Sequence, residues 1–97
     1  MRNLDKLVGE VITIKSSTGL EFIGILAEID DQIIAVSNPK AITLTQTGEV
    51  SIMPYTLTAD NALVDINLAT LLTVAKSMDQ TALDYKNMLL EENSAEE

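Results

Sequence analysis

The segment 20–29 restricts the fold of this chain more than any other, because it is apolar on both faces of one expected strand. Its apolar side chains alternate, with Ile23, Ile25, Ala27 and Ile29 on one face and Leu20, Phe22 and Leu26 on the other. A strand of this kind must be covered on both sides. Gly24, in its middle, predicts a bend or the close approach of another backbone segment. The segment therefore predicts a small, curved β structure.

Further β-branched and apolar runs, separated by turn residues, predict the remaining strands. They lie at 11–14, at 33–36 with a continuation through 42–44, at 50–57 with a bend at Pro54 and extended chain over 63–66, and at 71–74. Asn38-Pro39 interrupts the third run, and because proline has no N–H to donate it predicts a bulge or an edge there. The turns are short, which favours antiparallel neighbours. We expect a mainly β fold, a five-stranded, strongly bent antiparallel small barrel.

Helical patterns are found at both ends of the chain. Leu4, Leu7 and Val8 after Asn3 predict a short N-terminal helical turn. Ser77-Met78-Asp79-Gln80 has the pattern of a capping box, with Ser77 as the cap. The apolar stripe of the following helix, expected over about 78–92, is Met78, Ala82, Tyr85 and Leu89. We therefore expect a barrel domain over 1–76, with the C-terminal helix and acidic tail, 77–97, packed on the same domain.

Composition argues against most kinds of catalysis. The 97 residues include no Cys and no His, which excludes a disulfide, a thiol nucleophile and the commonest general base. No glycine-rich phosphate loop is present. Glu28, Asp30 and Asp31 could meet around a turn to hold Ca²⁺ or Mg²⁺, but the EF-hand glycine is missing and a solvated turn is favoured. We expect a protein that is not an enzyme and has no catalytic residue, cofactor or metal.

The N-terminus and the hydropathy bear on location. Residues 1–6 lack the long apolar stretch of a signal peptide. No apolar run approaches the roughly 20 residues that a membrane helix needs. We expect a cytoplasmic protein without a membrane partner.

The pattern Gly19-x-x-Phe22-x-Gly24-x-Leu26-x-x-Ile29-Asp30 resembles the first signature of the Sm and Sm-like (LSm, Hfq) proteins. The segment 64–74 is similar in outline to their second signature. The Asn38-Pro39 turn, the acidity and the C-terminal helix look like small Sm-like proteins carried by phages of marine cyanobacteria. This resemblance implies a cytoplasmic setting in a bacterial or phage-infected host cell.

The resemblance also implies self-assembly. It predicts a homo-oligomeric ring of roughly five to seven subunits, in which the last strand pairs with the fourth strand of a neighbour. The candidate interface residues are Leu71, Leu72, Thr73 and Val74.

The resemblance further implies a nucleic-acid site on two loops around the pore. Its candidate residues are Asp30, Asp31, Gln32, Ile34, Asn67, Leu68 and Ala69. Ile34 stands where RNA-binding members have a base-contacting asparagine, and Asn67-Leu68 replaces an arginine-glycine pair. Asp31 or Gln32 falls where a stacking aromatic is expected. The resemblance therefore implies a degenerate pore site.

Two functions from different classes stay open. The first is a ring that binds single-stranded RNA or DNA in nucleic-acid processing. The second is a structural or adaptor ring that binds a protein partner and no nucleic acid. The net charge of −9 favours the second, because it repels phosphates. The lysines Lys15, Lys40, Lys76 and Lys86 are scattered, although a ring would repeat each of them around its axis.

Overall fold

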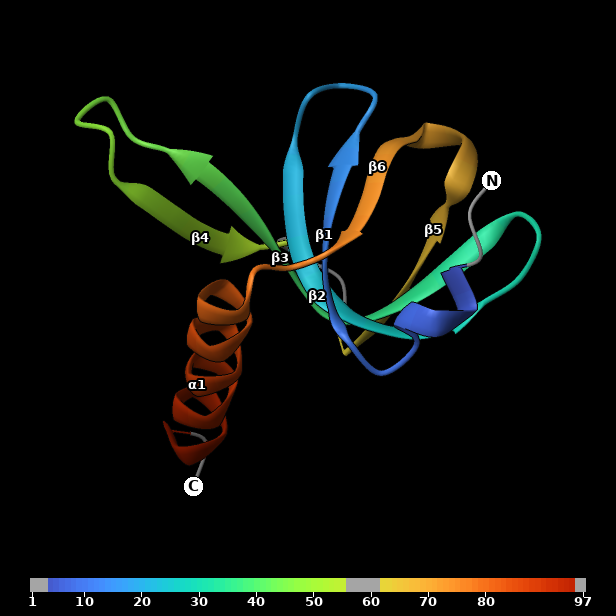
Figure 1. Cartoon of the computed structure of the whole chain (residues 1–97). Helices are drawn as coiled ribbons and strands as arrows, with labels where there is room; N and C mark the ends of the chain where they lie inside the picture. Colours follow the sequence, from blue (N-terminus) through green and yellow to red (C-terminus); the bar gives the residue numbers. More distant parts are fainter. Residues whose placement is uncertain (1–3, 56–61, 96–97) are drawn as a thin grey trace.

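The computed structural model of the chain describes residues 4–55 and 62–95 (Figure 1). The elements follow in the order η1 (Leu4–Leu7), β1 (Val11–Ser16), β2 (Glu21–Ile29), β3 (Ile33–Leu44), β4 (Val50–Pro54), β5 (Leu63–Asn67), η2 (Leu68–Thr70), β6 (Leu71–Lys76) and α1 (Asp79–Ala95). Both η elements are short 3₁₀ helices. No helix among the described residues is long and apolar enough to cross a membrane.

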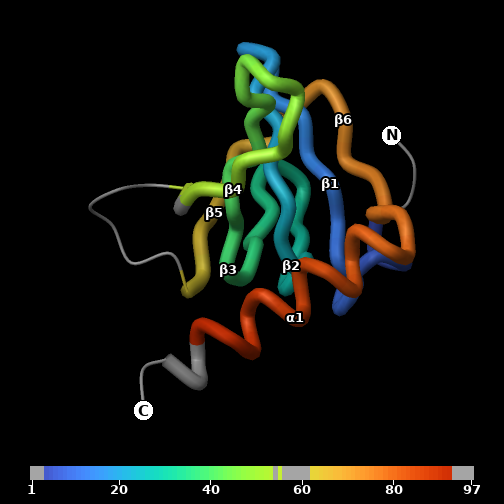
Figure 2. The backbone as a smooth tube through the Cα atoms, turned by 90° about the vertical axis from the view of Figure 1, so that its left-hand side faces the viewer, coloured from blue at the N-terminus to red at the C-terminus, as the bar shows by residue number. Residues whose placement is uncertain are grey.

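The strands form one strongly bent antiparallel sheet in the order β4-β3-β2-β1-β6. The remaining strand, β5, pairs with a different part of β3 from the part that pairs with β4. Figures 1 and 2 show the sheet curling around itself, with α1 to one side. The curl encloses a cluster of buried side chains: Ile12, Ile14, Phe22, Leu26, Ile34, Val36 and Ile66. The predicted mainly β fold, with an N-terminal helical turn and a C-terminal helix, is confirmed.

The number of strands differs from the expectation, because β3 has two successive partners. Its first part pairs with β5 from Ile33 to Ser37, and its second part pairs with β4 from Lys40 to Leu44. The expected fourth strand over 50–57 ends at Pro54 instead, and the extended segment at 63–67 is a strand of its own. Leu57 lies outside the described residues. The described chain thus has six strands rather than five.

The bulge predicted at Asn38-Pro39 is confirmed. Between the pairs Ile23–Lys40 and Ile25–Ser37 the register shifts, so three steps along β3 match two along β2. Asn38 has a φ of 50°, in the left-handed region that non-glycine residues seldom adopt. The bulge lies where β3 changes partner, so Pro39 falls outside both ladders.

Gly24 lies opposite this bulge, and the predicted close backbone approach is also confirmed. A Cβ atom at Gly24 would collide with Cγ1 of Val36 and would lie 3.2 Å from the Pro39 Cα and from the Ser37 carbonyl oxygen. Only glycine leaves room for β2 and β3 to pass this closely.

The helix α1 begins at Asp79, one residue later than predicted, and Ser77 does not cap it. The Ser77 hydroxyl is buried and shares a 2.7 Å hydrogen bond with the Thr13 hydroxyl, while the Gln80 amide donates to Asp84. Ser77 is drawn into the sheet because its N–H donates to the Val11 carbonyl, which extends the β1 ladder. The predicted capping box is therefore wrong.

The apolar stripe of α1 is confirmed except at its first residue. Tyr85 is 2% exposed and forms a second buried cluster with Val11 and Ile23, against which Ala82 and Leu89 pack. Met78 precedes the helix and is 76% exposed. The stripe thus attaches α1 to the outer face of β1 and β2.

Candidate pore-loop site

The turn between β2 and β3 is shaped by one carboxylate. Oδ1 of Asp30 accepts hydrogen bonds from the N–H groups of Gln32 and Ile33, both at 2.8 Å. Bonds to the charged form favour it, so these two amides lower the pKa of Asp30 from its usual 3.8. Asp30 is exposed. Its side chain acts on the shape of the turn.

The second loop is the 3₁₀ turn η2, and Asn67 caps it. Oδ1 of Asn67 accepts from the Ala69 N–H at 2.9 Å, and the Thr70 hydroxyl donates to the Asn67 carbonyl oxygen at 2.7 Å. Short polar side chains are preferred at such caps because they satisfy a free amide of the turn. Thr70 was not singled out from the sequence, although the Asn-x-x-Thr spacing signals this arrangement.

The structure brings the two loops together. The Leu68 N–H donates to the Gln32 carbonyl oxygen at 2.8 Å, and Ile33 pairs with Asn67 at the end of the β3–β5 ladder. The loops border an open hollow of about 450 Å³, lined by Asp31, Gln32, Asn67, Leu68 and Ala69. Five of the seven residues chosen from the sequence therefore lie around one hollow.

The chemistry of this hollow is polar and not cationic. Asp31 contributes a carboxylate, and Gln32 and Asn67 contribute amides that can donate to and accept from a base edge. Leu68 is half-buried and packs against the core cluster, so it offers the hollow a small apolar surface. None of the lining residues is a lysine or arginine. Base edges can be bound here, whereas phosphates gain no ion pair.

Ile34 is placed differently from the expectation. Its side chain is fully buried in the core and pairs with Ile66 across the β3–β5 ladder. Successive strand side chains point to opposite faces, so Ile33 is 39% exposed while Ile34 points inward. Ile34 is a core residue and does not present its side chain to a ligand, which corrects its inclusion in the site.

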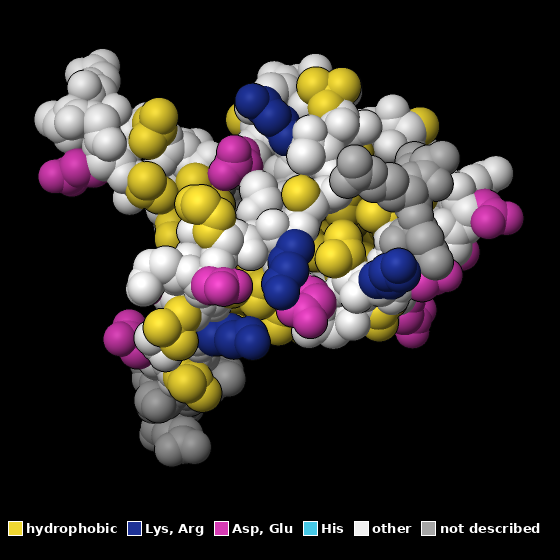
Figure 3. Space-filling view, viewed as in Figure 1, with side chains coloured by type: hydrophobic (Ala, Val, Ile, Leu, Met, Phe, Trp, Pro, Cys, Tyr) yellow, Lys and Arg dark blue, Asp and Glu magenta, His cyan; other side chains and the backbone are white. Residues whose placement is uncertain are grey.

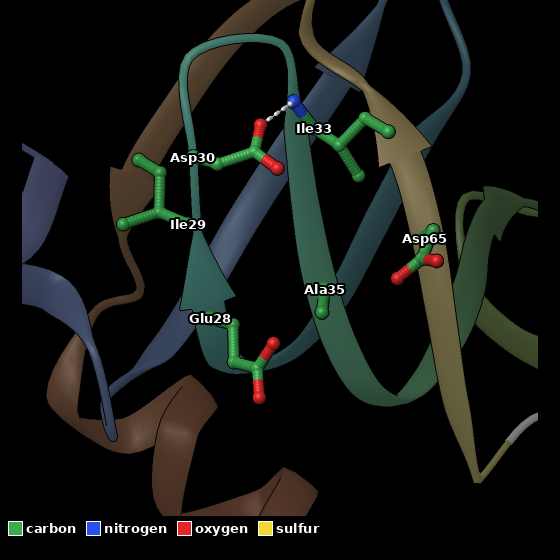
Figure 4. Close-up of a pocket in the computed structure, with 6 residues that line it drawn as sticks. All are labelled: Glu28, Ile29, Asp30, Ile33, Ala35 and Asp65. Carbon is green, nitrogen blue, oxygen red and sulfur yellow. Dashed lines mark hydrogen bonds between the residues drawn. The ribbon is translucent and has the colours of Figure 1, made fainter.

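Asp30 faces a separate, smaller hollow (Figure 4). This space of about 190 Å³ is lined by Glu28, Ile29, Asp30, Ile33, Ala35 and Asp65. Asp65 was not singled out from the sequence, and its strand β5 brings it to this space. Within residues 4–55 and 62–95, no three acidic side chains are grouped so as to hold a metal ion.

The candidate interface residues belong to strand β6 at the margin of the sheet. Within the described chain, β6 pairs only with β1, and β5 pairs only with β3. Leu72 and Thr73 are exposed, whereas Leu71 and Val74 are half-buried and pack on the core cluster. Both strands therefore have one side whose backbone groups lack a strand neighbour among the described residues.

This architecture, a 3₁₀ turn followed by a bent antiparallel sheet closed on a small core, is the Sm fold. The chain is similar to the P. aerophilum SmAP1 heptamer, with a TM-score of 0.56 and 16% identity over 77% of this chain and 88% of that one. A heptameric archaeal Sm protein gives the same TM-score and identity, covering 77% of this chain and 96% of that one. No protein-family model and no curated protein matches the sequence.

Proposed function

We propose that the chain is an Sm-like protein that forms a closed homo-oligomeric ring and binds single-stranded nucleic acid weakly at the pore-loop site. The observation that carries the proposal is the meeting of the two loops around one hollow, beside the margins of β5 and β6. The role is binding and not catalysis. The resemblance to phage-carried Sm-like proteins supports a cytoplasmic setting in a bacterial or phage-infected cell.

Ring formation is supported by strands with an unpaired edge, since β4, β5 and β6 each have a single strand partner among the described residues. Strand edges that stay unpaired invite further pairing. The expected fourth strand and its extended continuation are β4 and β5 in this structure, and the proposed head-to-tail contact joins β6 to β5 of the next subunit, which hides the outer edges of these two strands. Leu72 is 68% exposed and Leu63 is 55% exposed, and such a contact would cover these side chains. The two similar archaeal proteins are heptamers. We propose a ring of roughly five to seven subunits.

Sedimentation velocity at micromolar concentration tests the ring. The natural chain is expected to sediment as a single species several times the monomer mass. Leu72→Lys should shift it toward smaller species, because it places a charge in the proposed contact. Leu90→Lys is the matched control, since Leu90 is 65% exposed on α1 and belongs to neither strand of the proposed contact. A monomer, or equal effects of the two changes, would contradict the ring.

Nucleic-acid binding is tested by fluorescence anisotropy with single-stranded RNA and DNA oligonucleotides at two salt concentrations. The natural chain should bind weakly, with little dependence on salt, because its loops neutralise no phosphate. Asp31→Lys should strengthen binding and steepen the salt dependence by roughly 0.7 per phosphate contacted. Glu49→Lys makes the same charge change at the exposed tip between β3 and β4 and should do neither.

The adaptor function remains the second candidate because of charge. The chain carries −9, and the pore-loop hollow has an acidic residue and no basic one. If the ring forms and neither the natural chain nor Asp31→Lys binds an oligonucleotide, the nucleic-acid proposal is refuted and the adaptor role takes its place.

A further inference from the structure

A groove unrelated to the pore loops lies between the β3–β4 hairpin and α1. It has a volume of about 400 Å³ and is lined by Glu21, Ile23, Ile42, Val50, Ile52, Thr81, Asp84 and Tyr85. Figure 3 shows hydrophobic side chains gathered in the hollow between the projecting hairpin and the helix, with acidic side chains bordering it. None of these residues was selected as a site from the sequence.

The floor of the groove is apolar and part of it is accessible. Ile23 and Tyr85 are buried at its base, and Ile42 is half-buried. On the hairpin wall, Val50 is 62% exposed and Ile52 is 40% exposed. They are two residues apart on β4 and therefore share the face that lines the groove. The volume falls within the roughly 300–1,000 Å³ of typical ligand pockets.

The groove is held open by contacts on both walls. The Tyr85 hydroxyl donates to the Asn38 carbonyl oxygen at 2.7 Å, and the Lys40 ammonium pairs with the Glu92 carboxylate at 2.8 Å. These bonds fix α1 against the bulge of β3, and the β3–β4 ladder fixes the hairpin from Lys40 to Leu44. A groove built before its ligand arrives binds without the penalty of ordering its walls.

The charges of the groove select its occupant. Its two ionisable residues apart from Tyr85 are Glu21 and Asp84, both exposed carboxylates. A segment that combines apolar anchors with lysines or arginines complements both the floor and the border.

We propose that this groove docks a basic, apolar segment of another protein. The anchors contact Ile42, Val50 and Ile52, and the flanking cations pair with Glu21 and Asp84. The surface lies on the helix side of the barrel and shares no lining residue with the pore-loop hollow. The proposal therefore depends neither on nucleic-acid binding nor on the ring.

The test uses two fluorescent synthetic peptides of matched length, one of leucine and lysine in an amphipathic pattern and one with glutamate in place of every lysine. Anisotropy titrations with the full chain should show saturable binding of the lysine peptide and little binding of the glutamate peptide. Equal binding of both would overturn the role of charge, and no binding of either would overturn the proposal.

Paired variants locate the site. Glu21→Lys with Asp84→Lys should weaken binding of the lysine peptide about tenfold, because two exposed ion pairs are lost. Glu10→Lys with Glu28→Lys changes the net charge equally outside the groove and should have a much smaller effect. Equal losses in the two double variants would mean nonspecific attraction and would overturn the groove.

Ile52→Ser should weaken binding of the lysine peptide by a similar factor, whereas Val8→Ser, at a side chain that is 45% exposed after η1, should leave the binding unchanged. Circular dichroism confirms that each variant is folded before it is titrated. If Ile52→Ser instead lowers the assembly state of the chain without any peptide, a second copy covers the groove and the proposal is overturned. Sedimentation of Leu72→Lys and oligonucleotide binding of Asp31→Lys report on the ring and the pore loops separately.

Discussion

The hydroxyl of Tyr85 donates a hydrogen bond to the carbonyl oxygen of Asn38 at 2.7 Å and lies 3.2 Å from that of Ser37. This contact joins the middle of α1 to the one non-glycine position of the described chain whose φ is positive. The aromatic ring is buried against Val11 and Ile23. One side chain thus secures both the helix and the bulge of β3.

Tyr85→Phe should lower the free energy of unfolding by about 1 kcal/mol, because the ring still packs while the Asn38 carbonyl loses its donor. Urea unfolding measures this change. Tyr55→Phe removes the hydroxyl from a ring that packs edge-on against Phe22, and it serves as the control. Equal effects of the two substitutions would mean that the hydrogen bond to Asn38 contributes nothing to the free energy of unfolding.

The pH dependence of stability should report the same contact. Burial, with a smaller effect of the Glu92 charge, raises the pKa of Tyr85 from 10.0 to about 12. Because this pKa is higher in the folded state than in the unfolded state, the tyrosine ionises first in the unfolded chain. Its contribution to the free energy of unfolding is therefore fully present below pH 10 and is lost as the pH rises toward 12. Unfolding midpoints measured across this window should fall in the natural chain more steeply than in Tyr85→Phe. Parallel curves would contradict the assignment.

Gly24→Ala should destabilise the barrel by about 1–3 kcal/mol, because the new methyl group collides with Val36 opposite the bulge. The added Val36→Ala substitution makes room for that methyl group. The double variant should therefore lose less free energy of unfolding than the sum of the losses in the two single variants, as measured by urea unfolding. Simple additivity would show that the two side chains do not compete for space.

Ser77→Ala should destabilise the sheet and not fray the helix. Its hydroxyl is bonded to Thr13, 64 residues away in sequence, so a double-mutant cycle with Thr13→Val should give a coupling of about 1 kcal/mol. A double-mutant cycle of Ser77→Ala with Gln80→Ala should give no coupling energy. A coupling between these two residues would show that the capping box does form.

Ile34→Asn should lower the free energy of unfolding by about 3 kcal/mol, since it removes a fully buried apolar side chain and buries an amide. Ile33→Asn changes the neighbouring residue, which is 39% exposed, and should cost well under half as much. If both substitutions have the same small effect on urea unfolding, Ile34 is not a core residue.

The elements marked by alternating apolar side chains, or by a proline that interrupts a strand, could be predicted from the sequence. The β2 strand and the bulge at Asn38-Pro39 followed from local rules, because side-chain period and proline geometry act over a few residues. The two loops of the candidate site came from the resemblance, and the β3–β5 ladder then brought them together.

What could not be predicted depends on contacts between distant parts of the chain. Ser77 has the local pattern of a cap, yet its hydroxyl bonds Thr13 on β1 because the chain still follows the sheet at that point. The inward orientation of Ile34 depends on the register of β3, which a one-residue shift would reverse. The groove is formed by side chains from β2, β3, β4 and α1, so no single segment carries a signal for it.

Because β3 changes partner along its length, the tip of the β3–β4 hairpin takes no part in the β3–β5 pairing that helps to close the barrel. Thr45 and Glu49 close the exposed turn with a backbone hydrogen bond of 2.8 Å, and the ladder to β5 ends upstream, at Ser37. Extra residues inserted after Gln46 would lengthen an exposed turn, where added loop length carries only a small entropic penalty. We therefore expect the tip to tolerate an inserted epitope or reporter, which would let the chain serve as a display scaffold.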